Sequence, residues 1–539
     1  MEKRKAAVLI IFFFIATSMF FFSMSLKGQY NKARIEQKQN ADSSIHYDAD
    51  GEDDRIEILT KPGSRKRGQL NARKRDQLNT FELPRVEIGD LKQAPADAHM
   101  PGRPYKPNMT HLVDLPVEDA FRALVKEYLA PWLHPIDPDQ KPGVPLTQRA
   151  LATMEFSYKG GAFRVRIANK RLFYRKLVYW KQTYRSQRML WYLHFLWDML
   201  AKDGLLDGLP PIDFVIYVGD GPKVAADTFT TDAGFPLFSL RTSLTHIDIP
   251  VPDPVSFGSN GEYQWTETGK LVPWTERQDK LVFRGRGSCL KMQSDNWHVC
   301  NRVKAQKLSA ENKNLLDIGV IEWNQLYQSR LSEEELKEAE IEMTTQLRKA
   351  APMTFDEQSH YKYILDLDGG LGSSRKPGIL SSGSVLFSQD SPWYCFYEPL
   401  MAAYRHYIPV DRWLRTLVDK VKWAIEHDDV MKQIQRAGAA FERKFMSLEA
   451  SKAYMAILLR EYARLFPSAP FTNPDDPVEV NYCERMRGSQ GAAEIASGPM
   501  GCSGAWFEYT GEGSVPDYIV NDKAAFTRSK DPQPQQQLY

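Results

Sequence analysis

Three stretches of this 539-residue chain place polar or charged residues directly after runs that resemble buried strands. In the first, "FVIYVGD", residues 214–218 precede Gly219 and Asp220. A carboxylate at the end of such a strand could act as a general base that removes the proton from an attacking hydroxyl group. An aspartate in this position is also a common turn former, so position alone leaves the structural interpretation of Asp220 open.

The second stretch, "LVFRGRGSC", contains Arg284, Gly285, Arg286 and Ser288 at the end of an apolar run. Guanidinium groups and free backbone N–H groups suit a diphosphate, because charge-assisted and bidentate hydrogen bonds offset its negative charge. Two arginines on a solvated loop would give the same pattern. Both interpretations stay open on these residues alone.

The third stretch, "YKYILDLDGGLGSSRKPG", has the most flexible backbone, and its polar part contains Gly369, Gly372, Ser373, Ser374 and Arg375. It matches neither the dinucleotide fingerprint GxGxxG nor the Walker pattern GxxxxGK[ST]. A glycine–serine turn that enters a helix still exposes N–H groups able to hold an anion, and Arg375 would add positive charge. An ordinary turn is the alternative.

The patterns around these stretches indicate α/β architecture. "AFRVRIANKRLFYRK" is typical of a hairpin, residues 189–200 predict an apolar helix, and "DFVIYV" predicts a buried strand of the parallel type. Further strands are expected at residues 363–367 and 385–387, with helices from 410 to 466. Ligands of open parallel sheets bind beyond the carboxyl ends of the strands, where the three stretches lie.

Composition excludes several classes of protein. A formal charge of +2 argues against a dedicated nucleic-acid binder, which would show a concentrated basic face. The ten histidines are scattered, and the five cysteines lack zinc-type spacing, so we expect no metal site. The chain is too long for one ordinary core, and two successive α/β units would fit two doubly wound domains facing a cleft.

The N-terminus resembles a membrane anchor. Residues 6–26 carry no charged side chain and would reach about 31 Å as a helix, enough to cross a bilayer core. A cleaved signal peptide is the alternative, although its apolar core is usually only about 7–15 residues long. Lys3, Arg4 and Lys5 favour a cytosolic N-terminus, which would place the rest of the chain in the secretory lumen. The sequon at Asn108 agrees with that location.

Several motifs in one order resemble glycosyltransferase family 90. They are "LVFRGRGS", "YKYILDLDGGLGSSRKPGILSSGSVLFSQDSPWY" and "HYIPV", within a similarity that spans roughly residues 154–466. This family contains the Rumi-type protein O-glucosyltransferases and the capsule-associated β-1,2-xylosyltransferases. The resemblance implies two Rossmann-like domains facing a cleft (the GT-B type), a UDP-sugar donor, inversion at the anomeric carbon, no tightly bound cofactor and no required metal ion.

The resemblance also assigns residues. Asp220 falls on the family's catalytic base, and Arg375 with Ser373 and Gly369 falls on the loop that holds the UDP diphosphate. The full set of predicted donor-binding residues is Arg284, Gly285, Arg286, Ser288, Gly369, Gly372, Ser373, Ser374 and Arg375. This chain departs from the family pattern at Gly287, where some members have a second arginine, and at Cys395, where an acid is frequent. Asp366 and Asp368 receive no role from the sequence.

The resemblance and the patterns together predict five segments. These are a cytosolic tip and signal-anchor helix (1–26), a flexible stem (27–104), an acceptor-side Rossmann-like domain (105–265), a donor-side domain with closing helices (266–470) and an irregular tail (471–539). We expect a single-pass type II membrane protein of the Golgi or endoplasmic reticulum. It would transfer glucose or xylose from a UDP-sugar to a protein or glycan acceptor, without nucleic acid as a partner. A catalytically silent luminal binding or chaperone-like protein with the same fold is the alternative, and a membrane-tethered sugar-binding module is a third.

Overall fold

The structure, a computed structural model, describes residue 83 and residues 106–133, 161–175, 183–226, 236–253, 272–288, 300–323, 333–347, 349–465 and 507–510. All of these belong to one compact unit, Arg65–Tyr539. The predicted signal-anchor helix, residues 6–26, and most of the predicted stem and tail lie outside the described residues. Within the described residues, no helix has the length and apolarity needed to cross a membrane.

The first sheet is mixed, with strand order β13-β2-β1-β3-β4-β6. The predicted hairpin is confirmed: β1 (Ala162–Ala168) and β2 (Arg171–Arg175) pair antiparallel, and Asn169 and Lys170 form the turn with positive φ. Strand β3 (Ile212–Tyr217) pairs antiparallel with β1 and parallel with β4 (Leu237–Ser239). Strand β4 in turn pairs parallel with β6 (Ile249–Pro250) at the edge of the sheet. Three neighbouring strands therefore point their carboxyl ends to the same edge.

A strand from the C-terminal region completes this sheet. Residues 507–509, inside the range predicted as an irregular tail, form β13 (Phe507–Tyr509) and pair antiparallel with β2. The side chain of Tyr509 is buried. Aromatic residues favour strands, and β13 covers the hydrogen-bonding edge that β2 would otherwise leave open.

The second sheet is fully parallel and has five strands in the order β12-β10-β9-β7-β8. They are β7 (Gln278–Gly287), β8 (Leu316–Trp323), β9 (Tyr361–Asp366), β10 (Val385–Gln389) and β12 (Ile408–Val410). Both predicted strands of this region, at 363–367 and 385–387, are confirmed as neighbours. The chain moves from β7 outward to β8 and then returns to the other side of β7 with β9. The order of the strands thus reverses between β7 and β9, which is the switch point where doubly wound sheets bind ligands.

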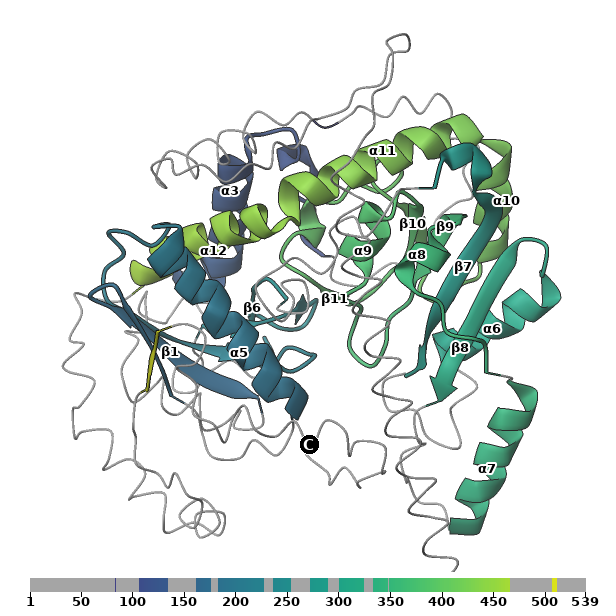
Figure 1. Ribbon diagram of the computed structural model, residues 1–539, viewed down its shortest axis with the longest axis horizontal. Coiled ribbons are helices and arrows are strands. Elements are labelled where there is room, and N and C mark those ends of the chain that lie inside the picture. Colours follow the sequence, from purple (N-terminus) through teal and green to yellow (C-terminus); the bar gives the residue numbers. More distant parts are fainter. Residues whose placement is uncertain are drawn as a thin grey trace, which may run out of the picture. The chain divides into compact units, whose positions relative to one another are not determined.

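Helices cover both sheets, and α6 lies beside β7 and β8 in Figure 1. The helices of the described residues are α3 (Val117–Leu133), α5 (Thr183–Trp197), α6 (Asn301–Glu311), α7 (Glu333–Gln346), α8 (Phe355–Gln358), α9 (Lys376–Ser381), α10 (Leu417–Glu426), α11 (Asp428–Phe445) and α12 (Leu448–Ala463). Helix α5 continues into a π-helical turn, Asp198–Lys202. Short pieces complete the fold: 3₁₀ turns Thr110–Leu112, Trp274–Glu276 and Glu398–Leu400, and the antiparallel pair β5 (Thr242–Ser243) and β11 (Trp393–Tyr394).

The last helix, α12, returns to the first sheet. Its range lies in the predicted donor-side domain, yet the Tyr454 hydroxyl donates to the carbonyl of Pro250 at 2.7 Å. The ring of Tyr454 also meets the ring of Phe121 on α3, with centroids 5.4 Å apart. Helical spacing shows that α12 has a buried face but does not show which core receives it. Helix α12 therefore packs against the end of β6 and against α3.

A buried histidine predicts how stability depends on pH. The His406 ring is fully buried, accepts a hydrogen bond from the Ala402 N–H at 2.9 Å and lies against Phe441. Burial, with the neighbouring Arg405, lowers the pKa of His406 to about 3. Because the unfolded imidazole titrates near about 6.5, only the unfolded chain gains a proton between these pH values.

We therefore expect the free energy of unfolding to fall by about 1.4 kcal/mol per pH unit as the pH drops below about 6.5. Urea unfolding at pH 7 and pH 5, on the native chain and on His406→Gln, measures this contribution. The variant keeps a hydrogen-bond acceptor but loses the titrating group. An equally steep pH dependence in His406→Gln would assign the effect to other residues.

Candidate functional site

The carboxyl ends of three parallel strands of the first sheet deliver Asp220, Arg241 and Asp253. Asp220 follows β3, Arg241 follows β4 and Asp253 follows β6. The Arg241 guanidinium joins the three segments, because its Nη1 donates to the Asp220 carbonyl at 3.2 Å and its Nη2 lies 3.3 Å from Asp253 Oδ2. Arg241 is 4% exposed. The sheet edge where the sequence predicted only Asp220 thus carries a cluster of three charged residues.

The Asp220 carboxylate is half exposed and lies beside a cation. Arg188 of α5 donates to Asp220 Oδ1 at 2.7 Å and to the carbonyl of Val218 at 3.0 Å. A neighbouring guanidinium favours the ionised carboxylate. Gly219 is required by the turn, since a Cβ there would lie 2.3 Å from the Tyr217 hydroxyl. Asp220 is therefore paired with Arg188 and accessible at the end of β3.

The segment after Asp220 is fixed by a second, buried carboxylate. Asp248 accepts hydrogen bonds from the N–H groups of Lys223 and Val224 at 2.8 and 2.7 Å and from the Ser239 hydroxyl at 2.6 Å. Burial raises the pKa of Asp248, and these hydrogen bonds oppose that rise. The chain that carries Asp220 is consequently anchored to the neighbouring strand.

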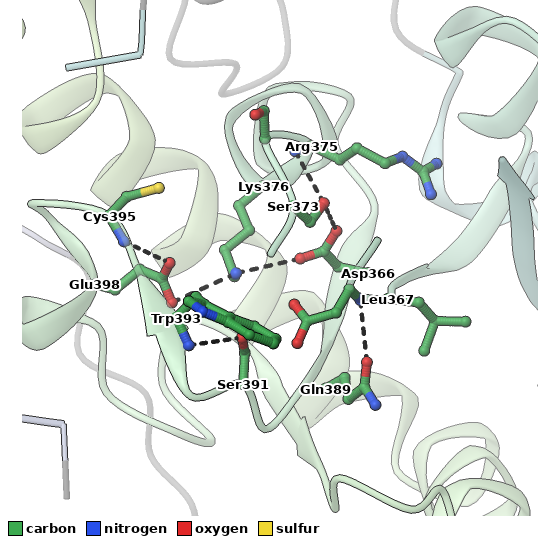
Figure 2. A network of polar contacts seen from close by, with 12 residues as sticks. Asp366, Leu367, Ser373, Arg375, Lys376, Gln389, Ser391, Trp393, Cys395 and Glu398 are labelled. Atoms are coloured by element: carbon green, nitrogen blue, oxygen red, sulfur yellow. Dashed lines mark hydrogen bonds and ion pairs between the residues drawn. The ribbon is translucent and has the colours of Figure 1, made fainter. Parts of the chain in front are cut away.

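On the second sheet, residues 367–375 form a loop at the switch point between β7 and β9; we call it the switch loop. Gly372 has a φ of +87°, a left-handed conformation that favours glycine. Its carbonyl accepts from the Gly369 N–H at 3.1 Å. The Ser373 hydroxyl donates to Asp366 Oδ1 and accepts from the Arg375 N–H at 3.3 Å, as Figure 2 shows. Hydrogen bonds between its own residues and with Asp366 therefore hold the backbone of the switch loop in this conformation.

A buried chain of charges ties the switch loop to the segment after β11. Figure 2 shows the Lys376 ammonium between Asp366 and Glu398, at 3.3 and 3.4 Å. Glu398 also pairs with Lys106 at 2.9 Å and accepts from the Cys395 N–H at 3.0 Å. Burial opposes the ionisation of Glu398, but Lys106 and Lys376 outweigh it and hold its pKa at about 2. Asp366, which the sequence left without a role, is one of the two carboxylates that fix Lys376.

Asp368 is the titrating group of this region. Burial raises the pKa of Asp368 to about 6, against the opposing effects of Lys376 and of a hydrogen bond from Ser391. Its N–H donates to Gln389 Oε1 at 3.1 Å. A carboxyl group at the end of β9 therefore changes its charge just below neutral pH.

Arg302 of α6 joins the two strand ends at the switch point. It donates to the carbonyls of Leu367 and Asp368 at 3.0 and 2.9 Å, to the Ser288 hydroxyl at 3.1 Å and to the Arg286 carbonyl. Burial lowers the pKa of Arg302 to about 10, which leaves it charged at neutral pH. No motif marks Arg302 in the sequence, because it lies inside an ordinary helix.

The predicted donor-binding residues divide into two groups. Ser288, Gly369, Gly372, Ser373 and Ser374 gather at the switch point; the Ser288 hydroxyl lies 3.4 Å from the place of a Cβ on Gly369. Gly285 lies in β7, where a Cβ would come within 2.7 Å of the Phe283 ring. The backbone positions are thus brought together as predicted, although donor binding by them stays a prediction.

Two of the three predicted arginines pair with residues of β8, and the third, Arg375, packs on the ring of Phe283, over which Arg302 also lies. Arg284 donates to the carbonyl and carboxylate of Asp317 on β8, both at 2.7 Å, and exposed Arg286 pairs with Glu322 at 3.1 Å. The Arg375 guanidinium donates to Gln358 Oε1 at 2.8 Å and lies over the Phe283 ring, 4.8 Å from its centroid. In Figure 2 the Arg375 side chain extends away from Asp366 and Lys376.

Ser374 connects the two sheets. Its hydroxyl accepts from Arg241 Nη2 and donates to Asp253 Oδ2 at 2.7 Å. A pocket beside this contact is lined by Asp253, Ser374, Pro377, Cys395 and Tyr397, among others. Among the described residues, no group of three or more His, Cys, Asp or Glu side chains could hold a metal ion. Arg241 and Ser374 therefore form a polar link between the segment of Asp220 and the switch loop.

Comparison with known proteins gives consistent matches. A family model described as Glycosyl transferase family 90 matches residues 136–494, more than half of the chain. Protein O-glucosyltransferase 3 of Rattus norvegicus is 28% identical over 295 residues, which cover 52% of this chain and 53% of that protein. Protein O-glucosyltransferase 1 of Homo sapiens is 25% identical over 281 residues, 50% of this chain and 65% of that protein.

The chain spans about half the length of the O-glucosyltransferase 3 proteins that it matches, including that of Homo sapiens, at 54%. A solved structure titled "Crystal Structure of TarM" aligns with 38% of this chain and 38% of its own, at 11% identity and a TM-score of 0.27. That similarity is too weak to indicate a shared fold.

Proposed function

Because this chain belongs to glycosyltransferase family 90, we propose that it transfers glucose or xylose from a UDP-sugar to a hydroxyl group of a protein or glycan. The relatives named protein O-glucosyltransferase favour a protein acceptor and glucose. The proposal includes inversion at the anomeric carbon, a GT-B arrangement of two Rossmann-like domains and catalysis without a metal ion. The parallel second sheet, with its reversed strand order, supports the donor-side part of that arrangement.

The observation that carries the proposal is the contact of Arg241 with both the Asp220 carbonyl and the Ser374 hydroxyl. It brings the predicted base next to the predicted diphosphate loop, although the two lie 154 positions apart in the chain's numbering. Asp220 then removes the acceptor proton while the acceptor oxygen bonds to the anomeric carbon. The bond from that carbon to the diphosphate oxygen breaks, and UDP leaves with the electron pair.

Charge that develops on the leaving diphosphate requires fixed donors. In this proposal, backbone N–H groups of the switch loop and the cationic group of Arg302, which is bonded to that loop, supply part of this stabilisation. Arg375 stays a predicted contributor, and its Nη2 donates to Gln358 Oε1 in this structure. We further propose that residues 6–26 anchor the chain as a type II protein in the Golgi or endoplasmic reticulum membrane, with the sheets in the lumen.

Release of UDP tests the proposed function directly. The purified full-length chain is incubated with UDP-glucose, UDP-xylose and other UDP-sugars, with and without a panel of protein and glycan acceptors. We expect acceptor-dependent release of UDP with one of the first two donors. Binding of neither UDP nor any UDP-sugar would contradict the proposal and favour the silent luminal binding protein.

Arg375→Ala tests whether that guanidinium contacts the donor. Loss of a charge-assisted hydrogen bond costs about 1.5–3 kcal/mol, so we expect UDP affinity to fall by about 10- to 100-fold. Titration calorimetry with UDP measures it. Arg171→Ala is the matched control, because its guanidinium also lies 4.8 Å from the centroid of a phenylalanine ring, that of Phe173 in the first sheet. Unchanged affinity in Arg375→Ala would confine Arg375 to its packing on Phe283.

A further inference from the structure

Arg241 forms hydrogen bonds with three segments, each of which follows a different strand. Two of these segments belong to the first sheet and one to the second sheet. The partners of Arg241 are the carbonyl of Asp220 after β3, the carboxylate of Asp253 after β6 and the hydroxyl of Ser374 in the switch loop. A planar guanidinium holds several acceptors in a fixed geometry, which an ammonium does not. We propose that Arg241 is a positioning residue that couples the state of the switch loop to the position of Asp220. This inference rests on the proposed function.

The switch loop is shaped around Arg241. A Cβ on Gly372 would lie 3.1 Å from Arg241 Cδ and 3.2 Å from its Nε, and 3.4 Å from the Cβ of Trp393. Glycine at this position therefore lets the loop backbone lie directly on the arginine side chain. Because protein interiors are close-packed, a shift of this backbone has to move the guanidinium or break its contacts.

The contacts of Arg241 are incomplete in this structure. Its Nε is buried and forms no hydrogen bond with any described residue. A buried donor without an acceptor carries an energetic cost. An acceptor brought to Nε, either a phosphoryl oxygen of the donor or a carbonyl of a rearranged switch loop, would remove that cost. Binding of the donor is therefore expected to tighten the arrangement of Arg241 and, through its bond to the Asp220 carbonyl, the chain around Asp220.

Hydrogen exchange of the amides of residues 218–224 tests the coupling with a readout other than activity. In the native chain, saturating UDP should slow exchange in this segment by about 10-fold, equivalent to about 1.4 kcal/mol of added local stability. Ser374→Ala breaks the link between Arg241 and the switch loop and should abolish this protection at a UDP concentration that still saturates the variant. Ser384→Ala is the matched control, because the Ser384 hydroxyl also accepts from a buried arginine, Arg277, but away from the site.

A second variant covers the case in which Ser374→Ala does not fold. Arg241→Lys keeps the charge and loses the planar fork, so kcat should fall by about 100-fold while the KM for the donor changes by less than about 3-fold. Unaltered kcat in Arg241→Lys, or full UDP-induced protection in Ser374→Ala, would overturn the coupling and leave the proposed function standing. Failure of the native chain to bind UDP would instead overturn the proposed function, and this inference with it.

Discussion

We expect Asp220→Asn to abolish sugar transfer and to leave UDP binding intact. The asparagine cannot accept the acceptor proton, and loss of a general base lowers kcat by about 10²–10⁴-fold. Its amide oxygen can still accept from Arg188, and its carbonyl can still accept from Arg241, so the turn after β3 should keep its place. Transfer assays with the productive UDP-sugar, together with UDP titration, separate the two effects.

Asp220→Glu distinguishes a chemical role from a structural one. Glutamate keeps a carboxylate and moves it by one methylene group, so a base at this position should recover part of the activity that asparagine loses. A residue needed only for the turn would give the opposite order, because asparagine preserves the shape of aspartate. Transfer by Asp220→Asn at the native rate would remove Asp220 from the mechanism.

The elements around the site could be predicted from local patterns, but their partners could not. Apolar runs and turn residues predicted the β1–β2 hairpin and the strands at 363–367 and 385–387. For the arginines of "FRVRI" the sequence predicts a hairpin but no partner. In the structure, Arg164 and Arg166 are buried on one carboxylate, with Nη2 atoms 2.6 and 2.9 Å from Asp213 Oδ2. That partner is on a strand more than 40 positions later, which no local pattern indicates.

For the site, backbone features were predictable and side-chain directions were not. Glycines and serines of the switch loop gather at the switch point because the sheet topology brings their strand ends together. Arg284 and Arg375 extend from the same region, but Asp317 and the ring of Phe283 determine where their guanidinium groups lie. Arg241 carries the signal that pointed to Asp220, a charged residue just after a buried strand, and could have been found with it. Arg302 carries no such signal.

The second large effect concerns the buried charges that fix the switch loop. Lys376→Met leaves the Asp366 and Glu398 carboxylates, both nearly fully buried, without the cation between them. Removing one partner of a buried ion pair costs about 3–5 kcal/mol, because the remaining charge stays desolvated. We expect the free energy of unfolding to fall by that amount at pH 7.5 and UDP binding to weaken with it. Urea unfolding and UDP titration measure both.

Lys362→Met is the matched control, because Lys362 also bridges two carboxylates, Asp279 and Asp428, whose side chains are 56% and 34% exposed. Solvated pairs contribute only about 0–1 kcal/mol, so this variant should unfold almost like the native chain. The pH dependence of the free energy of unfolding provides a second test. In the native chain the pKa of Glu398 is held at about 2, so its contribution to stability is lost only as the pH falls from about 4.5 towards 2. In Lys376→Met, Glu398 keeps Lys106 but loses one of its two cations, so its pKa should rise towards the ordinary value and its contribution to stability should shrink. Equal destabilisation in the two lysine variants would show that burial of the carboxylates is not what makes Lys376 important.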